Sequence, residues 1–318
     1  MKYFKKITKM LFLVVLITIN ILLLYKNMHK DKLIFTENFS SSYVDRQITL
    51  LEEPAGIISV ANKLYICDQK KHSIVVLDHC GNYLMEKGKF GSEPGEFISP
   101  IAIDFYNDHF YVLDYDNGRI QIFDNNFIYE SEIDITKIPT YINNKFSYNN
   151  ILVGEEGIYL SSQSNASRPI SSVLLIRNDG NMIVIKDHVY GSLIRYDNGS
   201  MFIKIGDNSS LKYRLTQNTY CKPVKFILSG DKNNCKFNTE LTYSIMENYN
   251  ERIIGLRPNG SCLDFYTEHG YQYSYSLIRN STEWNDRSLV AGSYEMTTDH
   301  QNIFIVNDSG DLLIIKEN

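Results

Sequence analysis

The sequence of 318 residues is short of several features that mark particular classes of protein. It has one tryptophan, seven prolines and five cysteines, and it has no Cys-x-x-Cys pair of the kind used in zinc or redox sites. Gly-x-Ser-x-Gly, Walker, His-Glu-x-x-His and dinucleotide-binding motifs are also missing. Apolar residues make up 43% of the chain, enough for a large core. The sequence therefore predicts a folded protein but names no reaction.

Residues 1–30 have a different character from the rest. Four lysines precede an apolar run from Met10 to Tyr25, which as a helix spans about 24 Å, and flanking residues can extend it toward the ~30 Å core of a bilayer. No small-x-small cleavage site follows, so the pattern favours an uncleaved signal anchor with a transmembrane helix at about 10–26, and a cleaved signal peptide is the second interpretation. The positive-inside rule then predicts a single-pass protein exported to the periplasmic or extracellular side.

Charge and cysteine content agree with an exported domain. Residues 31–318 carry 26 basic and 37 acidic residues, a formal net charge of −11, which argues against nucleic acid as a partner. Export permits disulfides, and Cys221–Cys235 is the favoured pair because it closes a loop between two predicted strands. Cys67 aligns with Leu113 in the repeat described next, so we predict a buried thiol there.

A repeat of 46 residues organises the first part of the exported chain. Short strands ended by polar turns recur, and the start of each second strand falls near residues 64, 110, 158, 201, 252 and 303. A recurrence of 43 to 51 residues with four strands in each unit is typical of propeller blades. We therefore predict a short tether at 31–45 and an all-β, six-bladed propeller with four-stranded antiparallel blades at 46–318. The shift superposes Pro54, Ile57, Tyr65, Asp68, Ile74, Asp78 and Tyr83 on Pro100, Ile103, Tyr111, Asp114, Ile120, Asp124 and Tyr129.

The last unit is one strand short. It reaches Asn318 after three predicted strands, whereas Arg46–Leu51 alternates like a strand and belongs to no other unit. We predict that Arg46–Leu51 pairs with Leu312–Ile315, so that an N-terminal strand completes the last blade and leaves no open sheet edge.

Three segments of the second unit resemble a known repeat: Glu96–Pro100, Phe110–Asp114 and Asn117–Asp124 are similar to the NHL repeat. The chain as a whole resembles bacterial membrane-associated six-bladed β-propellers of that type. The single tryptophan, Trp284, argues against WD repeats, and the lack of Gly-Gly pairs argues against kelch repeats. The resemblance implies a six-bladed ring that in many relatives binds a ligand or protein, without implying one reaction.

Blade geometry predicts where a ligand binds. Loops between second and third strands emerge on the same face as the links between blades, and propellers bind in the funnel formed there. We expect loops 68–72 and 114–118 and the link 90–97 to share this face. The candidate binding residues are Asp68, Lys70, His72, Asp114, Tyr115, Asp116 and Arg119.

Each candidate also has a structural interpretation. Asp68 and Asp114 suit a metal ligand or a base, but recurrence at equivalent positions favours two carboxylates that cap their own turns. The loop from Asp114 to Gly118 departs from EF-hand calcium spacing. Arg119 suits an ion pair, and His72 has no identifiable partner. We therefore predict no catalytic residue, no metal site and no cofactor.

The predicted function is an exported, membrane-anchored binding module for a protein, peptide or glycan. The alternative is a calcium-dependent hydrolase or lyase of the six-bladed propeller lactonase type, which requires three or four axial oxygen or nitrogen ligands meeting at one ion. A sensor subunit within a multi-protein complex is a third interpretation.

Overall fold

The structure, a computed structural model, covers the propeller in segments. The predicted anchor helix at 10–26 and the Cys221–Cys235 pair lie outside the residues whose side chains it describes. Within the described part, no helix has both the length and the apolarity to cross a bilayer. The described ranges are 36–136, 146–164, 171–187, 193–196, 200–206, 221–227, 245–250, 252–257, 262–267, 270–277 and 294–318.

The first three blades are four-stranded antiparallel sheets. The second repeats the first with the predicted shift, since β2, β3 and β4 end at residues 60, 68 and 78 and β6, β7 and β8 end at 106, 114 and 124. Blade I contains β2 (Pro54–Val60), β3 (Lys63–Asp68), β4 (Ser73–Asp78) and β5 (Tyr83–Lys87). Blade II contains β6 (Pro100–Tyr106), β7 (His109–Asp114), β8 (Arg119–Asp124) and β9 (Tyr129–Asp134). Blade III contains β10 (Phe146–Gly154), β11 (Gly157–Ser164), β12 (Ser171–Arg177) and β13 (Met182–Asp187).

The remaining strands form three further sheets. Blades V and VI have four strands, and blade IV has three within the described ranges. Blade IV contains β14 (Leu193–Tyr196), β15 (Ser200–Gly206) and β16 (Cys221–Ile227). Blade V contains β17 (Ile245–Tyr249), β18 (Arg252–Leu256), β19 (Cys262–Thr267) and β20 (Gly270–Ser276). Blade VI contains β21 (Tyr294–Thr298), β22 (Asn302–Asn307), β23 (Leu312–Glu317) and β1 (Phe39–Val44).

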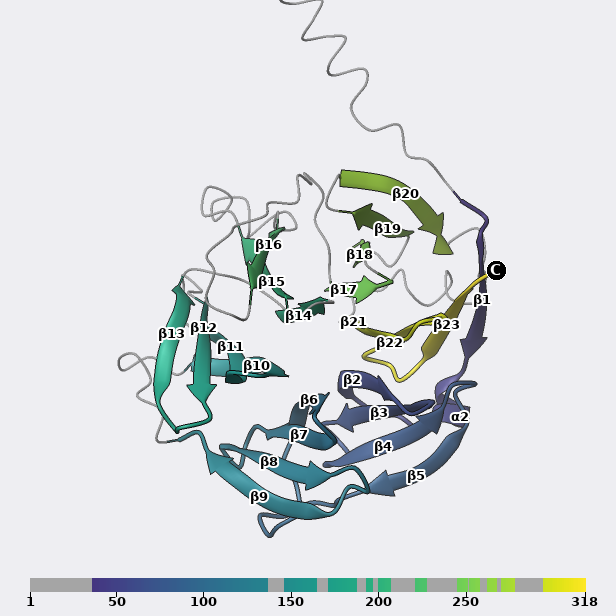
Figure 1. Cartoon of the computed structure of the whole chain (residues 1–318). Coiled ribbons are helices and arrows are strands. Elements are labelled where there is room, and N and C mark those ends of the chain that lie inside the picture. The colour runs from purple at the N-terminus through teal and green to yellow at the C-terminus, as the bar shows by residue number, and fades with distance from the viewer. Residues whose placement is uncertain are drawn as a thin grey trace, which may run out of the picture. The chain divides into compact units, whose positions relative to one another are not determined.

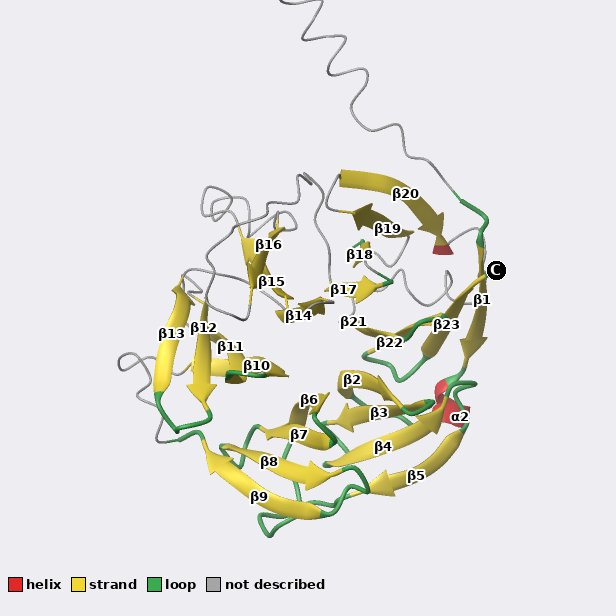
Figure 2. Cartoon of the chain, viewed as in Figure 1, coloured by secondary structure: helices red, strands yellow, loops and turns green. Residues whose placement is uncertain are grey.

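The sheets stand side by side around a common axis (Figure 1). The first strand of each blade is innermost, and β2, β6, β10, β14, β17 and β21 contact one another in that order until β21 meets β2. Almost all of the described chain is strand and turn (Figure 2). We call the side of the links between blades and the β3–β4 loops the link face. The side of the β2–β3, β4–β5 and β21–β22 turns is the hairpin face.

The hydrophobic core lies between neighbouring blades. Alternate residues of a strand point to opposite faces of its sheet, so each blade packs on two neighbours. One buried cluster joins blades I and II through residues such as Ile74, Ile103 and Phe110. Cys67 belongs to this cluster as a buried free thiol, which confirms its predicted role. Similar clusters join blades VI and I, and blades V and VI.

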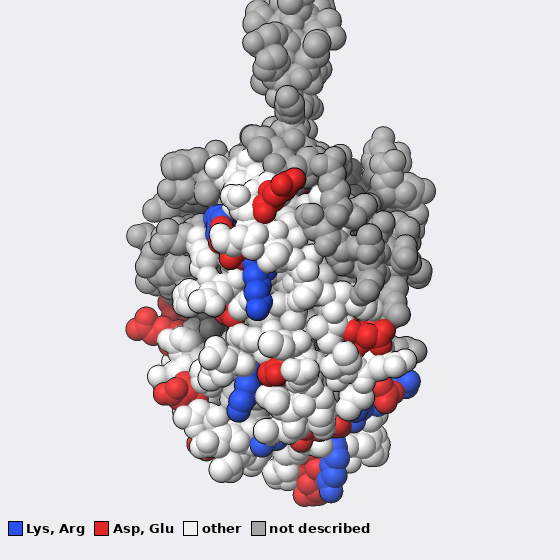
Figure 3. Space-filling view, turned by 90° about the vertical axis from the view of Figure 1, so that its right-hand side faces the viewer, with Lys and Arg blue, Asp and Glu red and all other residues white. Residues whose placement is uncertain are grey.

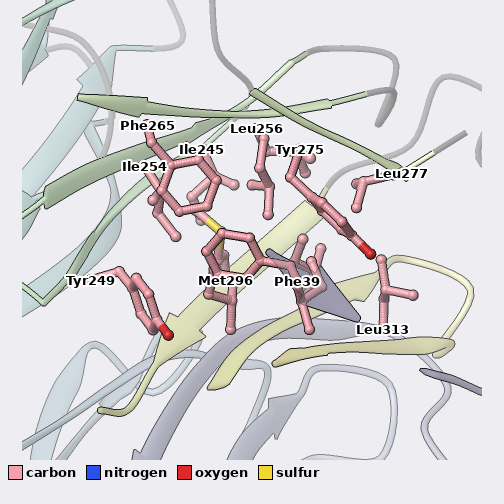
Figure 4. Packing of buried hydrophobic residues seen from close by; sticks show 14 residues of the cluster. Phe39, Ile245, Tyr249, Ile254, Leu256, Phe265, Tyr275, Leu277, Met296 and Leu313 are labelled. Atoms are coloured by element: carbon pink, nitrogen blue, oxygen red, sulfur yellow. The ribbon is translucent and has the colours of Figure 1, made fainter. Parts of the chain in front are cut away.

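An N-terminal strand completes the last blade, but not the predicted one. Strand β1 pairs antiparallel with β23, from Phe39 opposite Glu317 to Val44 opposite Leu312. Phe39 is 4% exposed, and its ring stacks on Phe265 of blade V with centroids 5.0 Å apart. Figure 4 shows Phe39 in the middle of the apolar cluster between blades V and VI.

The assignment of Arg46–Leu51 as the closing strand is therefore wrong. Arg46–Thr49 forms a single helical turn, α2, in which the Asp45 carboxylate accepts the N–H of Gln47 at 2.8 Å. Leu50 follows with a φ of +58°, which no strand residue adopts. Thr49 instead donates from Oγ1 to the carbonyl of Gly310 at 2.8 Å, which fastens the turn to blade VI. The strand that closes the ring, β1, precedes Arg46 and lies within the segment 31–45 that was predicted to be a tether.

Charged side chains are mixed on the outer side of the ring that carries β1 and β23. Basic and acidic groups alternate there with uncharged surface (Figure 3). In the described part of this side, neither sign of charge forms a continuous area.

Candidate functional site

A cavity of about 380 Å³ lies on the axis between the innermost strands. Five of these strands, β2, β6, β10, β17 and β21, line it within the described ranges. On β2 the lining runs from Ala55 to Val60, so the cavity extends along the axis rather than stopping at one face. Innermost strands splay as they run through a propeller, and the channel between them is the usual place for a ligand in this fold.

All the charged side chains among the described lining residues are acidic. They are Asp104 on β6, Glu247 on β17 and Glu295 on β21. The uncharged polar lining includes Ser59 and Thr297. The cavity is therefore a site of negative potential.

The three carboxylates differ in what holds them. Asp104 is 7% exposed and accepts the N–H of Phe105 at 2.8 Å and that of Val153 at 2.5 Å, so it fastens blade II to blade III. Glu247 accepts the N–H of Asn248 at 2.8 Å, and both Glu247 and Glu295 are half-buried. Burial raises the pKa of the Cys67 thiol well above its ordinary value, and the Glu295 carboxylate adds to the rise. Because they are more exposed than Asp104, Glu247 and Glu295 are the carboxylates that a ligand in the cavity reaches more easily.

On the link face, Asp68 is fully buried and holds backbone in place. Its carboxylate accepts N–H groups of Glu52 at 2.7 Å, Glu53 at 3.1 Å and Lys71 at 3.2 Å. These bonds cap the β3–β4 turn and tie it to the segment that enters β2. The side chain thus performs the capping role that its recurrence suggested.

Asp114 occupies the equivalent position in blade II and is also fully buried. It accepts the N–H of Ile98 at 2.8 Å and forms an ion pair with Arg119 at 2.8 Å. Arg119 also pairs with Glu132 at 2.8 Å and donates to carbonyls of the link between blades I and II. Burial opposes the charge of Arg119, but the bonds to Asp114 and Glu132 outweigh it and raise its pKa. The pair is a structural anchor for the link.

The other predicted site residues lie around these anchors. His72 has a partner that the sequence did not reveal, since its Nδ1 accepts the N–H of Ser99 at 3.0 Å. Lys70 is exposed and pairs with Glu52 at 2.9 Å. Tyr115 is half-buried and Asp116 is exposed. The structure thus brings the seven predicted residues to one face, where Lys70 and Asp116 are exposed and His72 and Tyr115 are half-buried. Asp68, Asp114 and Arg119 are buried.

The described ranges hold no group of three or more His, Cys, Asp or Glu side chains placed to share a metal ion. The axial carboxylates were missed from the sequence because each comes from a different blade, separated by 48 residues or more. The available signal was their position on first strands, since an acidic residue in an innermost strand must face either a neighbouring blade or the axis.

Comparison with known proteins places the fold. No curated protein matches the sequence. Virginiamycin B lyase from Staphylococcus aureus is similar in structure, with a TM-score of 0.52, 12% identity and coverage of 87% of this chain and 99% of the lyase. A putative gluconolactonase is similar with a TM-score of 0.56 and 11% identity, and the match covers 90% of this chain and 94% of the gluconolactonase. The calcium-binding protein regucalcin from Agrobacterium tumefaciens is similar with a TM-score of 0.55 and 8% identity, and the match covers 84% of this chain and 92% of regucalcin. At these identities the likeness concerns the fold alone.

The sequence itself carries a family signature. The profile of a family described as 6-bladed beta-propeller matches residues 30–223, which is more than half of the chain. The match includes β1 and all of blades I to III. The chain belongs to the 6-bladed beta-propeller family.

Proposed function

We propose that the propeller is a binding module that takes a basic group of a peptide or protein into the axial cavity from the link face. The observation that carries this proposal is the cavity of about 380 Å³ whose described charged lining is acidic throughout. A lysine ammonium or arginine guanidinium is the complementary group.

Electrostatics favours a basic ligand over a neutral one. A cation about 4 Å from a carboxylate near a protein surface gains about 4 kcal/mol, before the desolvation of both charges is subtracted. Glu247 and Glu295 are half-buried, so part of this attraction survives screening by salt. A neutral glycan would rely on hydrogen bonds to side chains such as Ser59 and Thr297. The carboxylates therefore favour a peptide or protein carrying a basic side chain.

A pair of matched peptides tests the proposal. Two labelled peptides of equal length, one with a central lysine and one with glutamine in its place, are titrated with the full chain by fluorescence anisotropy. We expect the lysine peptide to bind at least about tenfold more tightly, equal to about 1.4 kcal/mol. Glu295→Gln should reduce that ratio, whereas Glu52→Gln, an exposed change on the link face, should leave it unchanged.

Equal affinities of the two peptides would refute a role for the basic group. A glucosamine oligomer and its N-acetylated form provide the matched glycan arm. Preference for the amine form would assign the basic group to a glycan, and preference for the acetylated form would contradict the electrostatic basis of the proposal. The calcium-dependent hydrolase or lyase is supported by likeness of fold alone.

We also propose, from the sequence of residues 1–30, that the propeller is tethered to a membrane outside the cytoplasm and that its blades are of the NHL type. The test is protease accessibility in intact cells whose outer layers have been made permeable. We expect the propeller to be cleaved while a cytoplasmic marker protein is protected, and the protein to sediment with membranes. Recovery of an intact, soluble chain would contradict the tether.

A further inference from the structure

Three side chains meet on the hairpin face, where blade I contacts blade VI. The hydroxyl oxygen of Ser59 lies 2.9 Å from Nε2 of His79, and Nδ1 of His79 lies 3.2 Å from Oδ2 of Asp299. Ser59 is near the end of β2, His79 is in the turn before β5, and Asp299 is in the turn after β21. We propose that Ser59, His79 and Asp299 form a nucleophile–base–carboxylate triad that hydrolyses short-chain esters of hydroxyl-rich alcohols.

The fold fixes the position of Ser59 relative to blade VI. Ser59 and Ile57 are two residues apart on β2, so both side chains point to the same side of the sheet. Ile57 packs in the apolar cluster between blades VI and I together with Phe304. Ser59 therefore points toward blade VI at the hairpin end of the same interface.

The imidazole of His79 is held from two directions. The turn that carries it is capped by Asp78, whose carboxylate accepts the N–H groups of Cys80 at 2.8 Å and Asn82 at 2.9 Å. On the other side, the ring of Phe304 lies 4.7 Å from the imidazole, centroid to centroid. A base held by packing and by a capped turn keeps its orientation toward the nucleophile.

Asp299 divides its two oxygens between structure and the triad. Oδ1 accepts the backbone N–H groups of Gln301 and Asn302, both at 2.6 Å, and so closes the β21–β22 turn. Oδ2 faces Nδ1 of His79 and also accepts a hydrogen bond from the side-chain amide of Asn302 at 2.9 Å. A carboxylate beside Nδ1 favours the tautomer with the proton on Nδ1, which leaves Nε2 free to accept the proton of the serine hydroxyl.

The protonation state of His79 suits a general base. Burial lowers the pKa of His79 below 6.5, and the charges of Asp299 and Asp78 only partly offset that effect. The imidazole is therefore neutral at pH 7 and can take up a proton. Once protonated it gains the attraction of the Asp299 carboxylate, as a base in a triad requires.

A groove of about 400 Å³ opens beside the triad. Its described lining includes the polar side chains of Asn62, Asn248 and Thr298, whereas Ala61 is its one hydrocarbon side chain. Oδ1 of Asn248 is buried and lacks a hydrogen-bond partner among the described residues, so a substrate hydroxyl would satisfy it. Amides and hydroxyls suit an alcohol rich in hydroxyl groups, and the scarcity of hydrocarbon suits a short acyl group.

The reaction balances with water as the only co-reactant. His79 takes the proton of the Ser59 hydroxyl while the hydroxyl oxygen of Ser59 bonds to the ester carbonyl carbon. The side-chain amides of Asn62 and Asn248 line the groove and are the donors it offers to the tetrahedral oxyanion. The oxyanion collapses with release of the alcohol, which leaves with the proton from His79. In the second half-reaction, His79 takes a proton from water while the water oxygen bonds to the acyl carbon. The bond from the acyl carbon to Ser59 then breaks, and the Ser59 oxygen takes the proton back from His79. The products are the free acid and the alcohol.

A fluorophosphonate probe tests the triad without knowledge of the natural ester. The hydroxyl oxygen of an activated serine attacks phosphorus and displaces fluoride, which leaves a stable adduct. We expect one adduct per full-length chain, located at Ser59 by peptide mass spectrometry and absent in Ser59→Ala. His79→Gln should slow its formation by at least about 100-fold, the contribution of a general base. Ser40→Ala, an exposed serine on β1, should label like the wild type.

Two further readouts separate a catalytic role from a structural one. The labelling rate should rise with pH through an inflection below 6.5, because the neutral form of His79 is the active one. The chain should hydrolyse p-nitrophenyl acetate faster than the octanoate. A folded chain without an adduct at Ser59, or with equal labelling in His79→Gln, would overturn the proposal. Faster cleavage of the octanoate would overturn the short-chain specificity. Ser59 also lines the axial cavity, but labelling and ester cleavage are measured without an axial ligand, so these outcomes do not depend on what that cavity binds.

Discussion

Closure of the ring by β1 makes Phe39 one of the most consequential side chains outside the repeats. Truncation of Phe39 to alanine removes a ring that is 4% exposed and touches both blades V and VI. Figure 4 shows that the ring fills the space between Met296, Tyr275 and Leu313. No neighbouring element lies free to fill that space, because the cluster is bounded by two paired sheets.

The expected cost follows from that environment. Truncation of a buried phenylalanine costs about 3–5 kcal/mol, from lost burial and from the cavity left behind. The stacked contact with Phe265 at 5.0 Å adds an aromatic contribution of about 0.5–1.5 kcal/mol, which places Phe39 in the upper part of that range. At about 2 °C per kcal/mol for a domain of this size, the melting temperature should fall by roughly 6–10 °C.

The measurement is urea unfolding followed by far-ultraviolet circular dichroism. The matched control is Phe90→Ala, since Phe90 is 65% exposed and its removal should cost less than about 0.5 kcal/mol. A chain that starts at Thr36 should be as stable as a longer one that keeps β1. A chain that starts at Arg46 loses β1 and should be less stable than Phe39→Ala. Equal stability of Phe39→Ala and Phe90→Ala would refute the closing role of β1.

Two further predictions concern the ion pairs Arg119–Asp114 and Arg252–Glu317. Arg119→Met should cost about 3–5 kcal/mol in unfolding free energy, because it leaves the fully buried Asp114 without its ion partner. Lys70→Met, which breaks an exposed pair, should leave the unfolding free energy nearly unchanged by the same urea assay, and equal losses in the two variants would contradict the anchoring role of Arg119. Hydrogen bonds from Arg252 lower the pKa of Glu317 below 4.5. Its contribution to stability is therefore present above about pH 4.5 and is lost as pH falls through the lower folded-state pKa. Glu317→Gln should lose less stability than the wild type between about pH 5 and pH 3, and parallel curves would rule out this linkage.

The sequence predicted those parts of the fold in which periodicity and packing agree. The second strands of blades I and II begin at Lys63 and His109, one residue from the predicted 64 and 110. The 46-residue recurrence placed them because Asp68 and Asp78, where β3 and β4 end, both recur in blade II. Strand β1 was missed because Ser40, Ser41 and Ser42 give it no apolar alternation. An outermost strand has one neighbour and much exposed surface, so its position depends on pairing with β23 rather than on its own hydrophobicity.

The candidate sites were less visible in the sequence for a physical reason. Local recurrence identified structural residues: Asp68 caps its own turn as predicted, whereas Asp114 accepts the N–H of Ile98 in the link between blades and pairs with Arg119. Function in a ring depends on side chains that occur once and meet across blades. Ser59 and His79 are 20 residues apart in blade I, and their carboxylate partner comes from blade VI. Only the closure of the ring brings such residues together.

Carbodiimide cross-linking tests most directly whether a basic group enters the axial cavity. The reagent joins the amine of the bound lysine peptide to a carboxylate in contact with it, and peptide mapping locates the amide bond. We predict cross-links at Glu247 or Glu295, in amounts that fall when the unlabelled lysine peptide competes. Cross-links confined to exposed link-face carboxylates such as Asp116 would contradict binding in the cavity.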